Sequence, residues 1–85
     1  MEYILKELVR IFRKYEYSFE EKEINKNNQI MIEYKVSVPD IFALKNIHKE
    51  IKAFLYVENL YKDDTSFIKE TSSGLEYFIY LPKNR

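Results

Sequence analysis

The side chains that could carry out metal or nucleophilic chemistry are few in this sequence. His48 is the only histidine among 85 residues, and there is no cysteine. A zinc site or a catalytic triad needs two or more such side chains close together. His48 stands between Ile47 and Lys49 in a stretch that is predicted to be helical. We therefore expect a surface histidine, with a nucleic-acid or partner contact as the alternative, and neither a metal site nor a cofactor.

Carboxylates are the remaining candidates for catalysis. Four glutamates are clustered at Glu16, Glu20, Glu21 and Glu23, and two aspartates are adjacent at Asp63 and Asp64. A general acid needs a carboxyl group whose pKa is raised by an apolar, enclosed site. These carboxylates instead lie in polar runs beside lysines, which favours a solvated surface and, for the aspartates, a turn and cap. We therefore expect no catalytic residue and no enzymatic activity.

Phosphate-binding loops are also excluded. The P-loop, the dinucleotide-binding fingerprint and the GxxG nucleic-acid clamp all need clustered glycines, because the backbone must approach a phosphate closely. Gly74 is the only glycine in the chain. A single glycine cannot build any of these loops.

Basic residues provide a candidate nucleic-acid surface. The formal net charge is zero, yet the stretches predicted to be helical are basic and those predicted to be hairpins are acidic. If both helices cover one face of a sheet, their outer sides form a shared surface for phosphate contacts. Its members are Lys6, Arg10, Arg13, Lys14, Lys45, His48, Lys49 and Lys52. We favour the alternative of ordinary solvated helices with ion pairs such as Glu2–Lys6, because a pI near 6.6 gives little attraction for nucleic acid.

Two helices are predicted to carry these residues. Apolar residues recur at three- and four-residue steps within residues 2–15, which is typical of an amphipathic helix. A second helix of roughly twenty residues is predicted to follow Pro39 and Asp40. Pro39 favours extended backbone in the residue before it, and Asp40 is a natural N-cap. Residues 54–57 also fit the start of a strand, but the spacing of Ile51, Phe54 and Leu55 favours the helix. The residue at which the helix ends is left open.

The clearest strand spans residues 29–38. Ile30, Ile32, Tyr34, Val36 and Val38 alternate with more polar residues, and we expect all five to face the helices. The turn-rich stretch 25–28 precedes this strand and predicts a partner strand at residues 17–24. Residues 18–21 also match a helix capping box, so a helix is the alternative. We favour the strand.

A second hairpin is predicted at residues 66–71 and 75–81. Its loop would be Ser72-Ser73-Gly74, in which Gly74 provides a positive φ. The resulting order, αββαββ, predicts an α+β two-layer sandwich: a four-stranded antiparallel sheet with two helices on one face. We expect one domain over residues 1–85, built as an αββ pseudo-repeat of residues 1–38 and 39–82.

The sheet face away from the helices provides a candidate protein interface. In the last strand Phe78 and Tyr80 alternate with the residues that we expect to face the helices, and Ile24 is expected beside them. An apolar outer face tends to be covered, most simply by a second copy of the chain. The predicted interface residues are Phe78, Tyr80, Met31 and Ile68. Surface aromatics that reflect AT-rich codon usage are the alternative.

The function expected from these patterns is a small, non-enzymatic protein-interaction or regulatory module that binds a second copy of itself, as a homodimer, or another protein. One candidate of this kind is an inhibitor encoded by a mobile element. The alternative is a nucleic-acid-binding regulator that uses the basic outer face of the two helices. No apolar run approaches the length of about 18 residues that a membrane span needs, and the N-terminus lacks the pattern of a signal peptide, so we expect a cytoplasmic protein.

Overall fold

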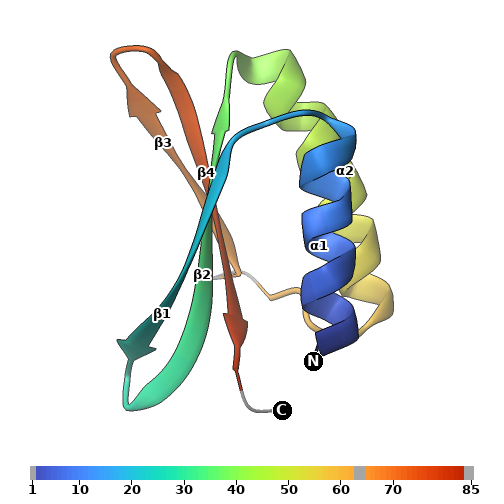
Figure 1. The fold of residues 1–85 in the computed structure, drawn as a ribbon, viewed down its shortest axis with the longest axis vertical. Coiled ribbons are helices and arrows are strands. Elements are labelled where there is room, and N and C mark those ends of the chain that lie inside the picture. The colour runs from blue at the N-terminus through green and yellow to red at the C-terminus, as the bar shows by residue number, and fades with distance from the viewer. Residues whose placement is uncertain (1, 63–64, 84–85) are drawn as a thin grey trace.

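The computed structural model describes residues 2–62 and 65–83 (Figure 1). Within these residues two helices and four strands follow one another in the order αββαββ, as predicted. Their bounds are α1 Glu2–Lys14, β1 Phe19–Lys26, β2 Gln29–Val38, α2 Ile41–Val57, β3 Ser66–Thr71 and β4 Gly74–Pro82. In this part of the chain, neither helix has the length and apolar character that crossing a membrane requires.

The strands form a single antiparallel sheet in the order β1-β2-β4-β3. β2 and β4 occupy the centre, so the two αββ units meet through their second strands. Both helices lie side by side on one face of the sheet, and the other face is open (Figure 1). The predicted two-layer α+β sandwich is therefore confirmed. β1 and β3 are the two edge strands.

The core lies between the helices and the two central strands. Four of the five alternating residues of β2 are buried there, as predicted: Ile32, Tyr34, Val36 and Val38. The prediction was wrong for Ile30, which is 41% exposed. Ile30 is the second residue of β2, beside the β1–β2 turn, and this end of the hairpin lies away from the helices (Figure 1).

α1 ends in a Schellman cap that uses no glycine. Glu16 has a left-handed φ of 61°. The Glu16 N–H donates to the carbonyl of Arg13 at 3.1 Å, and the Tyr17 N–H donates to the carbonyl of Phe12 at 3.3 Å. This pair of hydrogen bonds satisfies carbonyls that the helix leaves free. A residue other than glycine in this conformation carries a steric cost.

α2 begins and ends with equally defined caps. The Asp40 side chain accepts a hydrogen bond from the Ala43 N–H at 2.9 Å, which confirms the predicted N-cap. At the other end Asn59 has a φ of 60°, and the Leu60 N–H donates to the Leu55 carbonyl at 2.8 Å. The open question about the end of this helix is thereby settled: residues 54–57 are helical.

The first hairpin resolves the alternative for residues 17–24 in favour of a strand. β1 starts two residues later than predicted, at Phe19, and runs to Lys26. Asn27 and Asn28 have φ values of 53° and 63°, which fits the type I′ turn that matches the twist of two antiparallel strands.

The second hairpin has a shorter loop than predicted. Thr71 pairs with Gly74, so Ser72 and Ser73 alone form the turn. Gly74 does have a positive φ, at 152°, but as the first residue of β4. A Cβ atom there would lie 2.9 Å from the Val38 carbonyl oxygen. The need for glycine comes from this close approach of β2 as well as from the backbone conformation.

Candidate interaction surfaces

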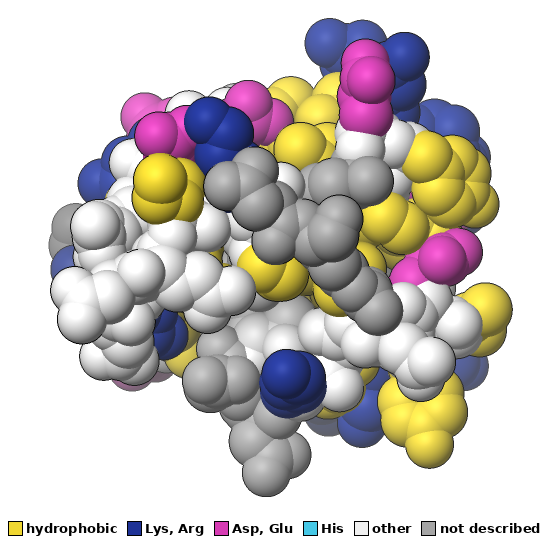
Figure 2. Space-filling model, turned by 90° about the horizontal axis from the view of Figure 1, so that it is seen from below, with side chains coloured by type: hydrophobic (Ala, Val, Ile, Leu, Met, Phe, Trp, Pro, Cys, Tyr) yellow, Lys and Arg dark blue, Asp and Glu magenta, His cyan; other side chains and the backbone are white. Residues whose placement is uncertain are grey.

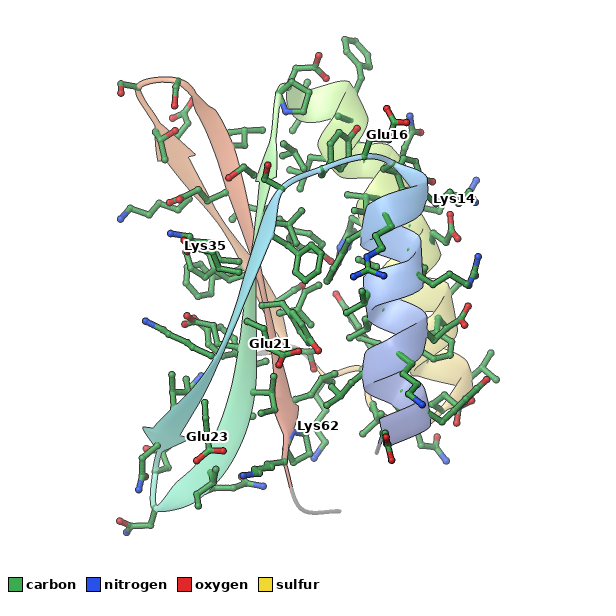
Figure 3. All side chains as sticks on the ribbon, in the orientation of Figure 1. Lys14, Glu16, Glu21, Glu23, Lys35 and Lys62 are labelled. Carbon is green, nitrogen blue, oxygen red and sulfur yellow. The ribbon has the colours of Figure 1, made fainter. Side chains whose placement is uncertain are left out.

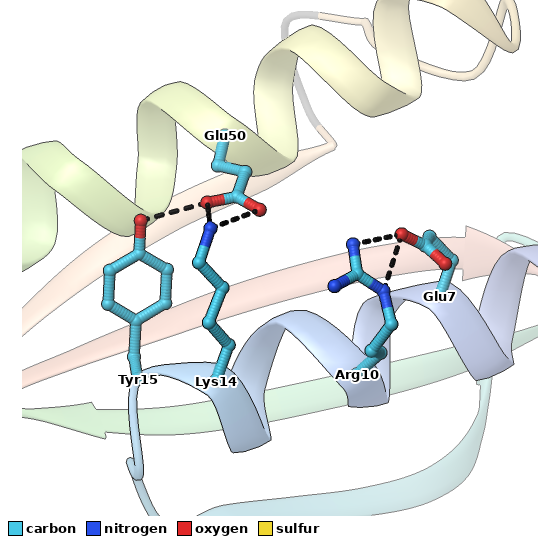
Figure 4. A network of polar contacts seen from close by, with 5 residues as sticks. All are labelled: Glu7, Arg10, Lys14, Tyr15 and Glu50. Carbon is cyan, nitrogen blue, oxygen red and sulfur yellow. Dashed lines mark hydrogen bonds and ion pairs between the residues drawn. The ribbon is translucent and has the colours of Figure 1, made fainter.

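The helical surface holds most of the predicted phosphate-binding cations, but several are already neutralised. Lys14 Nζ contacts the Glu50 carboxylate at 2.9 Å, and the Tyr15 hydroxyl donates to the same carboxylate at 2.9 Å (Figure 4). The hydrogen bond from Lys14 is the main cause that lowers the pKa of Glu50. Glu50 thus ties α1 to α2 through a charged network.

Two further cations of α1 pair within their own helix. Arg10 donates to the Glu7 carboxylate (Figure 4), which lowers the pKa of Glu7. Lys6 pairs with Glu2 at 3.7 Å, four residues away. This is the alternative that the sequence favoured, with solvated helices that carry local ion pairs.

His48 is not the plain surface histidine that we expected. Its ring is half-buried, and Nδ1 lies 2.6 Å from the hydroxyl oxygen of Tyr77 on β4, in a hydrogen bond. The two rings are nearly perpendicular, with their centroids 5.5 Å apart. Burial is the main cause that lowers the pKa of His48, and nearby Lys52 adds to it. His48 therefore joins α2 to the sheet and is removed from the outer basic surface.

Four cations of the predicted surface remain. Within residues 2–62 and 65–83, no ion pair involves Arg13, Lys45, Lys49 or Lys52. The Lys52 ammonium lies over the Tyr61 ring, 5.4 Å from its centroid. Both helices do lie on one face of the sheet, as a shared surface requires.

A shallow groove separates α1 from the first hairpin. Leu5, Val9 and Tyr34 form its apolar floor, Glu21 lies on its β1 side, and its volume is about 460 Å³. Figure 3 shows Glu21 pointing from the sheet toward the helices. The Tyr34 hydroxyl donates to the Glu21 carboxylate, and burial is the main cause that raises the pKa of Tyr34.

A second hollow lies at the lower end of the molecule, where the β1–β2 turn approaches the segment that follows α2. Its volume is about 330 Å³, and Lys26, Asn27, Asn59 and Lys62 are among its polar lining residues. Figure 2 views this end, and apolar side chains gather there mainly on the helix side. Exposed apolar residues at these helix ends are Tyr3, Tyr56 and Val57, which we call the helix-end patch.

The open face of the sheet is charged on its β1–β2 side. Lys35 on β2 contacts Glu20 on β1 at 2.8 Å and Glu76 on β4 at 3.6 Å, so one lysine bridges three strands. Figure 3 shows Lys35 on the side of the sheet away from the helices. Lys22 pairs with Glu33 at 3.6 Å in the next row. Cross-strand pairs of opposite charge stabilise such a face without apolar cover.

The β4–β3 side of the open face is aromatic. Phe67 of β3 stacks on Phe78, with centroids 4.6 Å apart and planes 7° from parallel, and on Tyr80 at 5.7 Å. We call Phe67, Phe78 and Tyr80 the aromatic strip. Phe67 is 48% exposed. Phe67 was not among the predicted interface residues, because its place beside Phe78 depends on the β3–β4 register, which no local pattern reveals.

Tyr80 is on the open face but is mostly covered by its own chain. It is only 9% exposed, and the Lys26 ammonium lies 4.8 Å from its ring centroid. Burial, followed by a hydrogen bond with Glu33, raises the pKa of Tyr80 to about 12. Tyr80 is therefore the buried member of the aromatic strip, and Phe67 is the most exposed member of the strip.

The other two predicted interface residues differ in position. Met31 pairs with Ile24 and Pro82 on the open face and is partly buried. Ile68 pairs with Tyr77, whose side chain faces the helices, so Ile68 lies on the helix side and not on the open face as predicted. It is nevertheless 53% exposed, because neither helix extends over β3. The edge strand β3 thus exposes an apolar side chain on each of its faces.

Comparisons with known proteins add no functional assignment: no family model, curated protein or solved structure matches this chain. Within the described residues, no group of three or more histidine, cysteine, aspartate or glutamate side chains could hold a metal ion.

Proposed function

We propose that this chain is a non-enzymatic protein-interaction module that functions as a homodimer, with the β3–β4 side of the sheet as its contact surface. The observation that carries the proposal is the aromatic strip beside an edge strand, where Phe67 is 48% exposed and neighbouring Ile68 is 53% exposed. Aromatic side chains anchor protein interfaces more often than most residue types.

The energetics of a small chain support a second copy as the occupant. The chain has 85 residues and no cysteine, so its stability rests on a limited core. Burying apolar surface contributes about 25 cal/mol per Å², and a two-fold dimer buries the same patch on both subunits. The charges on the β1–β2 side of the open face are neutralised by ion pairs, and the apolar residues Ile24 and Met31 of that side are partly buried. Phe67 on the β3–β4 side is therefore the most exposed apolar side chain of the open face.

The experiment is to measure molar mass by light scattering coupled to size exclusion. Replacing both Phe67 and Phe78 by serine should give a folded monomer, with folding checked by circular dichroism. Tyr80 is unsuitable for this purpose, because its buried ring contributes to the fold. Phe42→Ser is the matched control, since Phe42 is 73% exposed on α2, and this variant should remain dimeric.

A third variant separates the two exposed apolar surfaces. Replacing Tyr56 and Val57 by serine removes most of the helix-end patch, and we expect the dimer to persist. If this variant is a monomer and the Phe67/Phe78 variant remains a dimer, the interface lies at the helix ends and the proposal is contradicted.

A nucleic-acid-binding role is the second candidate. The observation in its favour is that Arg13, Lys45 and Lys49 lie on the helical layer without ion pairs among the described residues. If this role is correct, replacing Arg13 or Lys49 by alanine should weaken binding to all sequences alike and lower the salt slope by about one. Fluorescence anisotropy with a labelled duplex at two salt concentrations tests it, and no binding at low salt contradicts it.

A further inference from the structure

Within the described residues, the outer edge of β3 has a defined pattern of backbone groups that point away from the sheet. The Tyr80 N–H donates to the Thr65 carbonyl at 2.7 Å, so residues 65 and 80 form a hydrogen-bonded pair. Such pairs alternate along an antiparallel ladder, and Phe67 and Lys69 therefore also bond to β4. Ser66, Ile68 and Glu70 then direct their N–H and C=O groups away from the sheet, toward a neighbour that would extend it.

At the opposite edge of the sheet, the charges of β1 disfavour pairing with β1 of a second copy. β1 has the sequence FEEKEINK. In a two-fold antiparallel pair, residues of the two copies face each other symmetrically about a central residue. Centring on Glu21, Lys22 or Glu23 places each of these charges opposite its own counterpart. Like charges directly opposite are destabilising, and charged edge strands discourage edge-to-edge association.

In β3, one register centred near the middle of the strand avoids placing like charges opposite each other. Centring on Lys69 would place two ammonium groups opposite each other. Centring on Phe67 would pair only residues 66–68 of the strand. Centring on Ile68 pairs residues 66–70 and places Ile68 opposite Ile68, Phe67 opposite Lys69, and Ser66 opposite Glu70, with no like charges.

We propose that two copies join β3 to β3 in the register centred on Ile68, giving a continuous eight-stranded antiparallel sheet. This inference rests on the proposed homodimer and specifies its geometry: the β3 edge with Phe67 and Ile68 contacts the partner, whereas Phe78 on β4 acts by holding the Phe67 ring in place. The three residues with outward backbone groups, Ser66, Ile68 and Glu70, exchange hydrogen bonds with the partner's Glu70, Ile68 and Ser66. On the open face, the partner's Lys69 lies beside Phe67 and adds a cation to the edge of the aromatic strip.

Cysteine cross-linking tests the register, and the chain has no native cysteine to interfere. In this register the Ile68 Cα atoms of the two copies are about 5.5 Å apart, within the span of a disulfide. Ile68→Cys should form a covalent dimer with oxidised glutathione. Phe67→Cys and Lys69→Cys should each do so at least about tenfold less, because those symmetric pairs are diagonal, roughly 7–8 Å apart. An equimolar mixture of these two variants should cross-link.

Amide hydrogen exchange gives a second measurement that needs no substitution. In the dimer, the amides of Ser66, Ile68 and Glu70 should be protected, and dilution to the monomer should remove that protection. The amides of Phe67 and Lys69 bond to β4 and should stay protected, which provides a control within the same strand.

The outcomes separate this inference from the proposed homodimer. Preferential cross-linking of Phe67→Cys or Lys69→Cys would show another register and overturn the inference. A dimer by light scattering with no cross-link at any of the three positions would also overturn it and leave the homodimer in place. A wild-type monomer at every concentration would overturn both.

Discussion

Phe67 and Phe78 stack almost parallel across the β3–β4 ladder, with ring centroids 4.6 Å apart, although Phe67 belongs to an edge strand and keeps 48% of its surface exposed. The Phe78 ring is partly buried on the central strand β4, whereas the Phe67 ring on the edge strand β3 is accessible to a partner. The stack holds the Phe67 side chain in place before any partner arrives, so less side-chain entropy is lost on binding.

The aromatic stack should be measurable as a coupling energy. In a double-mutant cycle of Phe67→Ala and Phe78→Ala, we expect coupling of about 0.5–1.5 kcal/mol, measured by urea unfolding at concentrations where the chain is monomeric. The cycle of Phe67→Ala with Phe42→Ala should be additive, since these rings do not stack on each other. Coupling near zero for Phe67 with Phe78 would show that the stack makes no contribution.

Two isoleucines of β2 provide a matched test of the core. Ile32 is 8% exposed and Ile30 is 41% exposed, on the same side of the same strand. We expect Ile32→Ala to lower the free energy of unfolding by about 1–4 kcal/mol, because it leaves a cavity in the core. Ile30→Ala should cost less than half as much. Equal losses, measured by chemical denaturation, would contradict the position of the hairpin end.

Glu16 should limit stability through its backbone conformation. Its φ of 61° is accessible to glycine at no steric cost, so Glu16→Gly should raise the free energy of unfolding by roughly 0.5–1 kcal/mol despite the greater freedom of the unfolded chain. Glu16→Ala is the control and should not stabilise, since it keeps the Cβ atom. A glycine variant no more stable than the alanine variant would argue against the left-handed cap.

The single histidine should make stability depend on pH. The pKa of His48 is lowered in the folded state, mainly by burial, so the unfolded chain binds the proton more tightly. The stabilisation is then fully present above the ordinary histidine pKa of about 6.5 and is lost progressively as the pH falls through the lowered folded value. Unfolding at pH 7 and pH 5.5 should show this loss in the wild type.

The control for this pH effect is His48→Gln, which cannot titrate in that range. Its unfolding free energy should change less between the two pH values than that of the wild type. The pKa values of Glu7, Glu20 and Glu50 are lowered by their cationic partners, so these carboxylates titrate below this window. An unchanged pH dependence in the glutamine variant would show that His48 is not the group responsible.

The sequence predicted the fold because the relevant signals are local. The alternation in residues 29–38, the Pro39-Asp40 boundary and the stripe of α1 each concern neighbouring positions. The boundaries were less well predicted: Glu16 and Asn59 end helices in a left-handed conformation that the pattern does not indicate, and the bounds of β1 and of the second hairpin loop each differ by one or two residues.

The candidate surface was only partly predictable, because it depends on contacts between distant residues. Phe78 was identified from the alternation of its own strand. Phe67 was missed and Ile68 was assigned to the wrong face, because both positions depend on the β3–β4 register. His48 is drawn inward by Tyr77, which lies 29 residues further along the chain. Tyr80 looked like an exposed anchor, whereas Lys26 and Glu33 from the first hairpin cover it.

Sedimentation equilibrium of the wild-type chain over a range of concentrations determines whether the chain forms the proposed homodimer. We expect a reversible monomer–dimer equilibrium whose upper mass is twice the 10.4 kDa of the chain. The dimer should be lost when Phe67 and Phe78 are both replaced by serine. A mass of 10.4 kDa at all concentrations would contradict the proposed homodimer.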